Sequence, residues 1–133
     1  MHRSRLTAIV IDCLPEHFEE SVRFWAAALG VKQPRKPGAS QRYVHLKRPD
    51  NDVDVLLQKV DKDPGIHLDI ESDSIDREVA RLEAHGATRK GKVKRWWVMR
   101  DPSGLAFCVV RDQGKGLLKK QKPWRDAEPA GKA

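Results

Sequence analysis

The sequence lacks the features that would place it among membrane or disulfide-stabilised proteins. Its longest apolar run without a charge is LTAIVI (residues 6–11), which is far too short to span a membrane. The N-terminal MHRSR has no signal-peptide core, and only two cysteines occur, Cys13 and Cys108, both inside apolar runs. We therefore expect a cytoplasmic protein with no membrane partner and no disulfide framework.

Motifs of several enzyme classes are also missing. The chain has no glycine-rich phosphate loop, no GxSxG turn and no zinc-type cysteine spacing. The histidines at 17, 45 and 85 lack a metal-like partner at i+4, so we interpret them as surface or structural residues. The pattern assigns no catalytic residue.

The residues that are present suffice for one hydrophobic core. The chain has 133 residues, of which 39% are hydrophobic and 34% charged. Residue patterns predict strands at 6–13, 41–47, 52–60, 65–72, 95–100 and 105–110, and amphipathic helices at 15–29 and 74–86. Hairpin turns are expected at 49–51 and at DPSG (101–104), where Asp, Pro and Gly suit a type I turn and need no catalytic explanation.

The two halves of the chain repeat the same order of motifs. AIVIDC (8–13) aligns with HLDIES (67–72) at an offset of 59, and RFWAAALGV (23–31) aligns with VARLEAHGA (79–87) at an offset of 56. The predicted helices are too few to connect all these strands in parallel, so we expect an α+β fold with two related halves.

These motifs, in this order, resemble the vicinal oxygen chelate superfamily, and within it the glyoxalase-like domains related to glyoxalase, bleomycin-resistance proteins and dioxygenases. The strongest pieces are DCLPEHFEESVRFWAAALG and the stretch from GIHLDIES to DPSGLAFCVV. The resemblance implies an α+β domain over residues 1–112, built from two βαβββ modules (about 5–60 and 65–112) that form curved mixed sheets around a cleft. It also implies a homodimer.

Metal-dependent members of that superfamily take ligands from four strand positions, which the resemblance places at Ala8, Gln58, His67 and Cys108. Only His67 offers the expected donor, so we predict no metal site and no cofactor. We expect these four residues, together with Trp97, to line a cleft for a small molecule. Trp96 and Trp97 must face opposite sides of their strand, and the pattern leaves open which one faces the cleft.

Cys108 should face away from the helices if Phe107 and Val109 pack beneath them. The resulting hypothesis is a metal-free protein that binds or sequesters an uncharged planar molecule, or an enzyme that works without metal. The sequence leaves open which of the two applies. An alternative is a metal-dependent lyase or dioxygenase whose metal is held by His67, Cys108 and Gln58.

The C-terminal segment 113–133 is basic and has no periodic apolar face. Residues 111–133 contain seven Lys or Arg against three Asp or Glu, or +4 of the total charge of +7. We expect a flexible tail whose deletion after Gln113 leaves folding intact. A further alternative is that KGLLKKQKPWR contacts nucleic acid, with Trp124 stacking on a base, although a solvated tail is favoured.

Overall fold

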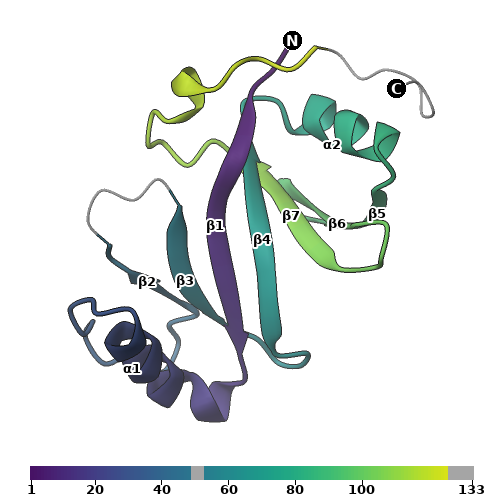
Figure 1. The fold of residues 1–133 in the computed structure, drawn as a ribbon. Helices are drawn as coiled ribbons and strands as arrows, with labels where there is room; N and C mark the ends of the chain where they lie inside the picture. The colour runs from purple at the N-terminus through teal and green to yellow at the C-terminus, as the bar shows by residue number, and fades with distance from the viewer. Residues whose placement is uncertain (49–52, 126–133) are drawn as a thin grey trace. The chain divides into compact units, whose positions relative to one another are not determined.

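Strands and helices follow one another along the chain as the sequence predicts for an α+β fold (Figure 1). The structure, a computed structural model, describes residues 1–48 and 53–125. The elements are β1 (Ser4–Cys13), η1 (Pro15–His17), α1 (Phe18–Ala28), β2 (Tyr43–Leu46), β3 (Asp54–Lys59), β4 (Gly65–Ser72), α2 (Ile75–Ala84), β5 (Thr88–Val93), β6 (Trp96–Arg100), β7 (Ala106–Arg111) and η2 (Leu118–Lys120). The turn predicted at 49–51 lies outside the described residues.

The elements group into two compact units. The N-terminal unit comprises Ala8–His67, and the C-terminal unit comprises Met1–Thr7 with Leu68–Ala133. The division does not follow the predicted repeats, because β1 and β4 each contribute residues to both units. Within the N-terminal unit the strand order is β2-β3-β1-β4, and within the C-terminal unit it is β1-β4-β7-β6-β5.

Strand pairing confirms that the two halves are related. The first strand of each half pairs in parallel with its last strand, β1 with β3 and β4 with β7. The strands that precede the last strand of each half are antiparallel to their neighbours. These pairs are β2 with β3, β6 with β7, and β5 with β6. The first module has only two strands after its helix, because residues 29–42 form none, so it is one strand shorter than the implied βαβββ pattern. The residue pattern did not predict β5.

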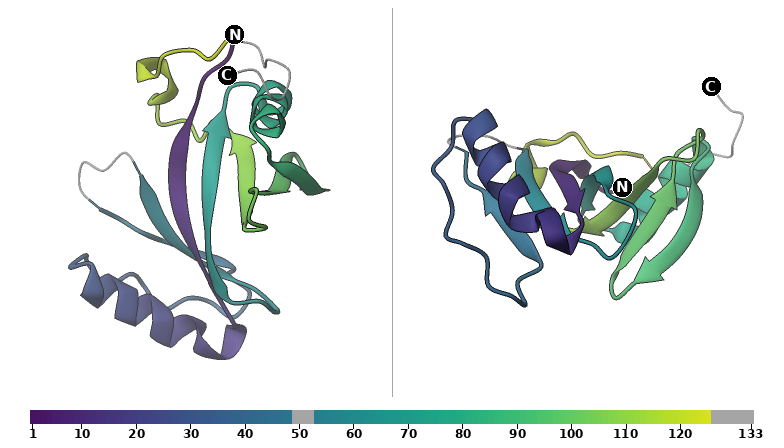
Figure 2. Two further views of the ribbon diagram at one scale, coloured as in Figure 1. Left: turned by 45° about the vertical axis from the view of Figure 1, so that its right-hand side comes forward. Right: turned by 90° about the horizontal axis from the view of Figure 1, so that it is seen from below.

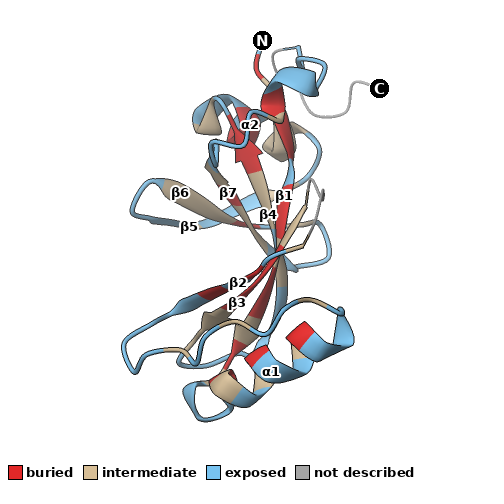
Figure 3. Cartoon of the chain, turned by 90° about the vertical axis from the view of Figure 1, so that its left-hand side faces the viewer, coloured by how far each residue is buried: buried red, intermediate tan, exposed pale blue. Residues whose placement is uncertain are grey.

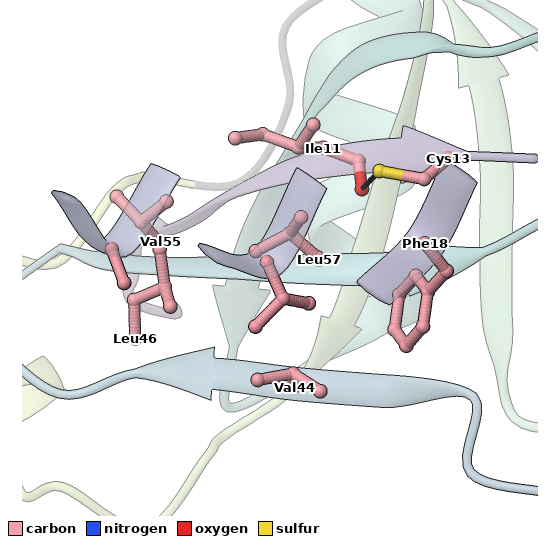
Figure 4. Close-up of a cluster of buried hydrophobic side chains, with 9 residues drawn as sticks. Ile11, Cys13, Phe18, Val44, Leu46, Val55 and Leu57 are labelled. Atoms are coloured by element: carbon pink, nitrogen blue, oxygen red, sulfur yellow. Dashed lines mark hydrogen bonds between the residues drawn. The ribbon is translucent and has the colours of Figure 1, made fainter. Parts of the chain in front are cut away.

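The core of the N-terminal unit lies between α1 and its strands. Phe18, Val22 and Ala26 recur at every fourth position and are buried, while the outer side of α1 is exposed (Figure 3). They pack against alternate residues of the strands (Figure 4): Ile11, Cys13, Val44, Leu46, Val55 and Leu57. The helix ends where Gly30 adopts a φ of +69°, which glycine tolerates best.

α2 forms the corresponding core of the C-terminal unit. Val79, Met99 and Val109 are fully buried there, with Trp97 and Phe107 packed against them. The Ser74 hydroxyl caps the helix by accepting from the backbone N–H of Arg77 at 3.4 Å. No helix in the described part of the chain is long and apolar enough to cross a membrane.

The DPSG segment is a turn, as predicted. The backbone N–H of Gly104 donates to the carbonyl of Asp101 at 3.0 Å, which closes it. The Asp101 carboxylate accepts from Ser103 and from the backbone N–H of Leu105. These hydrogen bonds lower the pKa of Asp101, led by the one from the Ser103 hydroxyl. The Asp101 carboxylate is thus explained by its contacts within the turn.

The C-terminal segment differs from the predicted flexible tail up to Arg125. It returns to the N-terminus of β1, where the backbone of Trp124 pairs with that of His2 (Figure 2). Leu118 is only 4% exposed, and the Trp124 indole N–H donates to the Ser4 hydroxyl at 2.8 Å. One Trp and one adjacent pair of Leu residues carry no periodicity, so the sequence pattern could not reveal this docking. Residues 126–133 lie outside the described part.

A buried ionic cluster lies under this segment. Glu78 of α2 is fully buried and bonds His2 at 2.8 Å and Arg81 at 2.8 and 2.9 Å. The Arg81 guanidinium in turn lies over the Trp124 ring, 4.0 Å from its centroid. Burial raises the pKa of Glu78, but hydrogen bonds from Arg81, His2 and Ser4 outweigh it, so the pKa lies below the usual glutamate range.

Candidate functional site

A row of polar side chains crosses the strands of the N-terminal unit on the face away from α1. His67 of β4 bonds Asp12 of β1, with Nδ1 and Oδ2 2.6 Å apart. Asp12 is the register neighbour of Gln58 on β3, and Gln58 is the register neighbour of Tyr43 on β2. The Gln58 amide donates to the Tyr43 hydroxyl at 3.2 Å. We call these four residues the polar row.

Strand alternation explains why the row forms. Ile11 and Cys13 pack toward α1, so Asp12 between them must point to the opposite face. The same parity places Gln58 after Leu57, and Tyr43 before Val44, on the face of Asp12. Four residues that are far apart in the sequence therefore meet on one surface.

The row contains an imidazole held by a hydrogen bond and, within the part of the chain that the structure describes, a carboxylate oxygen that lacks one. The His67 and Asp12 side chains are only 17% and 15% exposed, so their hydrogen bond lies largely out of water. A carboxylate that accepts from Nδ1 fixes the imidazole ring and its tautomer, as in many binding and catalytic sites. Among the described residues, the buried Oδ1 of Asp12 has no hydrogen-bond partner. The row thus places a buried carboxylate oxygen beside a fixed imidazole.

Apolar residues flank the row on the same face. Ala8, Val10 and Leu56 form a buried cluster there, with exposures of 4%, 2% and 8%. Ala8, Gln58 and His67, all predicted as ligand contacts, therefore share one face of the N-terminal unit. Sequence reasoning missed Asp12 and Tyr43. The available signal was Asp12 itself, the one charged residue of the strand predicted at 6–13.

The strand register corrects the position assigned to Gln58. In the second half, Cys108 pairs with Asp69, and the offset of 59 makes Val10 the counterpart of Asp69. Val10 pairs with Leu56, so Leu56 corresponds to Cys108. Gln58 lies two residues further along β3.

This register bears on the metal that the fold family implies. In the N-terminal unit, the counterparts of His67 and Cys108 are Ala8 and Leu56, which have no donor atom and belong to a buried apolar cluster. These residues do not fit a divalent ion.

The other two predicted contacts belong to the C-terminal unit. Cys108 lies on the face away from α2, as predicted, because Phe107 and Val109 pack toward that helix. Trp97 was wrongly assigned to the ligand cleft. It pairs with Val109 and packs in the α2 cluster, so Trp96 is the tryptophan on the opposite face.

Cys13 is a structural thiol on the α1 side of β1. It is 6% exposed, and its Sγ donates to the carbonyl of Ile11 at 3.7 Å. Burial raises the pKa of the Cys13 thiol and the charge of Asp12 raises it further, against a lowering by a hydrogen bond with Ser21. The thiol stays protonated near neutral pH, so it is a poor nucleophile.

The chain belongs to the glyoxalase-like domain family, whose sequence model matches residues 8–110. That range covers both related halves, including the polar row. No curated protein matches the sequence significantly.

Two solved structures share the fold of this chain at low sequence identity. Hypothetical protein BH1468 from Bacillus halodurans C-125 is 14% identical, with a TM-score of 0.61 over 85% of this chain and 97% of its own. A chain of the NAD-dependent benzaldehyde dehydrogenase from Legionella pneumophila is 10% identical, with a TM-score of 0.59 over 78% and 96%. A glyoxalase/bleomycin resistance protein from Albidiferax ferrireducens T118 is 15% identical over 81% and 98%, but its TM-score is only 0.31.

Proposed function

We propose that this glyoxalase-like protein binds a small planar organic molecule, without a divalent metal, on the face of the N-terminal unit that carries the polar row. The observation that supports this most directly is the 2.6 Å hydrogen bond that fixes His67 against Asp12. A fixed imidazole beside the Gln58 amide and the Tyr43 hydroxyl can recognise a hydrogen-bonding edge, and the Tyr43 ring, which is 44% exposed, provides an aromatic surface.

The expected ligand is an uncharged heteroaromatic ring. Asp12 and His67 are already hydrogen-bonded to each other, and Gln58 and Tyr43 are neutral. A bare anion would gain no Lys or Arg partner from the four residues of the row to offset its desolvation.

Tyr43 provides a specific reporter, because it is the only tyrosine in the chain. Protein labelled with 3-fluorotyrosine gives one fluorine resonance, which can be titrated with nicotinamide, adenine and indazole as probes. We expect at least one probe to shift this resonance. His67→Ala should weaken that binding by about 1–2 kcal/mol, or roughly five- to thirty-fold, through the lost hydrogen bond.

His17→Ala is the matched control, since His17 belongs to the same unit and lines a cavity of about 370 Å³ beside α1 that shares only Asp12 with the polar row. A probe that binds at the row should be insensitive to this substitution. If the His17 variant loses affinity while the His67 variant retains it, the ligand occupies the cavity beside α1 and the proposal is wrong.

We further propose that two chains associate through β4, since Ile66 and Leu68 on this strand are 62% and 44% exposed. Ile66→Asp should shift the protein toward monomer in sedimentation velocity. Phe24→Asp is the control, because Phe24 is similarly exposed, at 61%, but lies on α1. A wild-type monomer at high micromolar concentration would contradict dimer formation.

A further inference from the structure

A second cavity lies in the C-terminal unit, on the same side of its strands as α2. Its volume is about 660 Å³, which is large enough for a small metabolite. It is bordered by the end of β4, the first turn of α2, the β5–β6 turn and the end of β7. None of its residues belongs to the polar row, so it is independent of the function proposed above.

Basic side chains gather on the wall of this cavity. They are Lys92, Lys94, Arg95 and Arg111. Within the described residues, none of the four takes part in a salt bridge with an acidic side chain. Like-charged groups held close together without counter-ions favour the binding of an anion.

The acidic residues of the wall have structural partners. The Asp73 carboxylate accepts from the backbone N–H of Arg3, and the Asp112 carboxylate accepts from that of Gly114, both at 2.8 Å. Asp76 lies in the first turn of α2, where the helix dipole offsets a negative charge. Their charge is thus partly compensated within the protein, whereas that of the basic residues is not.

Trp97 adds an aromatic surface to the same wall. Lys92 Nζ lies 5.9 Å from the centroid of its ring, so positive charge and aromatic surface adjoin. This combination distinguishes the cavity from a simple basic patch, because it can hold a planar ring and an attached anionic group together.

The β5–β6 turn is strained where it meets the cavity. Lys94 adopts a φ of +52°, a left-handed conformation that lysine rarely adopts and glycine adopts freely. A glycine would therefore fit this turn better, yet the position carries one of the four charges of the wall.

We propose that this cavity binds a small molecule that carries a phosphate group on a planar ring, with the ring against Trp97 and the phosphate among Lys92, Lys94, Arg95 and Arg111. The affinity should fall as ionic strength rises, because the cations are exposed. Adenosine monophosphate is the probe, compared with adenosine, which lacks the phosphate, with inorganic phosphate, which lacks the ring, and with tryptamine, which carries the opposite charge.

Protein labelled with 5-fluorotryptophan reports the binding, with the Trp97 resonance assigned from Trp97→Phe. We expect adenosine monophosphate to shift this resonance and to bind more tightly than the other three compounds. Lys94→Gly should weaken the binding about two- to five-fold, and Lys94→Gly with Arg111→Gln about ten-fold. The glycine variant should melt no lower than the wild type, so a lost affinity cannot be ascribed to unfolding.

Lys32→Ala is the matched control, because it removes one exposed positive charge from the N-terminal unit. The proposal fails if Lys32→Ala and Lys94→Gly weaken binding equally, since the effect is then only one of net charge. It also fails if adenosine or tryptamine binds as tightly as adenosine monophosphate, or if the Trp97 resonance does not move. The fluorotyrosine signal used for the polar row should be unaffected in all these titrations.

Discussion

Replacing Trp124 by alanine should destabilise the protein, because this residue holds the C-terminal segment against the N-terminus of β1. Trp124 is 42% exposed, so more than half of its surface is removed from water. For a tryptophan of about 250 Å², this is roughly 140 Å² and at most about 3.5 kcal/mol of hydrophobic stabilisation.

Two polar contacts add to this contribution. The hydrogen bond to Ser4 is worth about 1 kcal/mol, and the guanidinium of Arg81 over the ring about 0.5–1 kcal/mol. Fraying of the released segment regains chain entropy and offsets a large part of the loss. We therefore expect Trp124→Ala to lower the free energy of unfolding by about 2 kcal/mol and the Tm by roughly 6–10 °C.

Thermal and urea unfolding followed by circular dichroism measure this effect. Trp124→Phe keeps a ring beneath Arg81 but removes the indole N–H, so it should lose about 1 kcal/mol. Truncation after Gln113 should cost more than Trp124→Ala, because it also removes the buried Leu118. Truncation after Arg125 removes none of these contacts and is the control. If the variants cut at 113 and 125 unfold at the same temperature, the segment does not stabilise the fold.

Three further results are expected. The pKa of Glu78 is depressed in the folded protein, so the stability that this carboxylate contributes is present above about pH 4.3 and is lost as the pH falls through its lower folded value. The Tm of Glu78→Gln should accordingly vary less between pH 5 and pH 3 than that of the wild type, and equal slopes would contradict this reasoning. Cys13, with its raised pKa and 6% exposure, should react with a thiol reagent at pH 7 only after unfolding, and mass spectrometry of labelled peptides tests this. Protein purified and then incubated with manganese, nickel or zinc should retain no stoichiometric metal, and one tightly bound ion per chain that His67→Ala abolishes would refute this.

The sequence predicted those elements whose apolar residues follow a regular period. GIHLDIES predicted β4 with its observed bounds. The helix expected after β1 is also present, and its buried residues Phe18, Val22 and Ala26 recur at every fourth position. TRKGKV did not predict β5, since its residues are nearly all polar and exposed, and only pairing with β6 makes it a strand.

The candidate site was predictable in part for the same reason. Alternation correctly separated Cys108 from Phe107 and Val109, but it could not decide between Trp96 and Trp97, which are equally apolar. The residue pattern of a single strand does not tell which strand it pairs with. The shift from Gln58 to Leu56 and the contact of Asp12 with His67 appear only when the register is known.

The composition of β5 also affects how the protein behaves in concentrated solution. Among the described strands β5 is the last one of the C-terminal unit, so one of its edges has no neighbouring strand in that part of the chain. An open edge can recruit strands from other molecules and start aggregation. Here Arg89, Lys90 and Lys92 carry like charges along that edge, and the pairing slips between Arg89 and Gly91, which disturbs the straight ladder that an incoming strand would need. The charged residues that prevented the prediction of β5 from the sequence also disfavour the pairing of its open edge with other molecules.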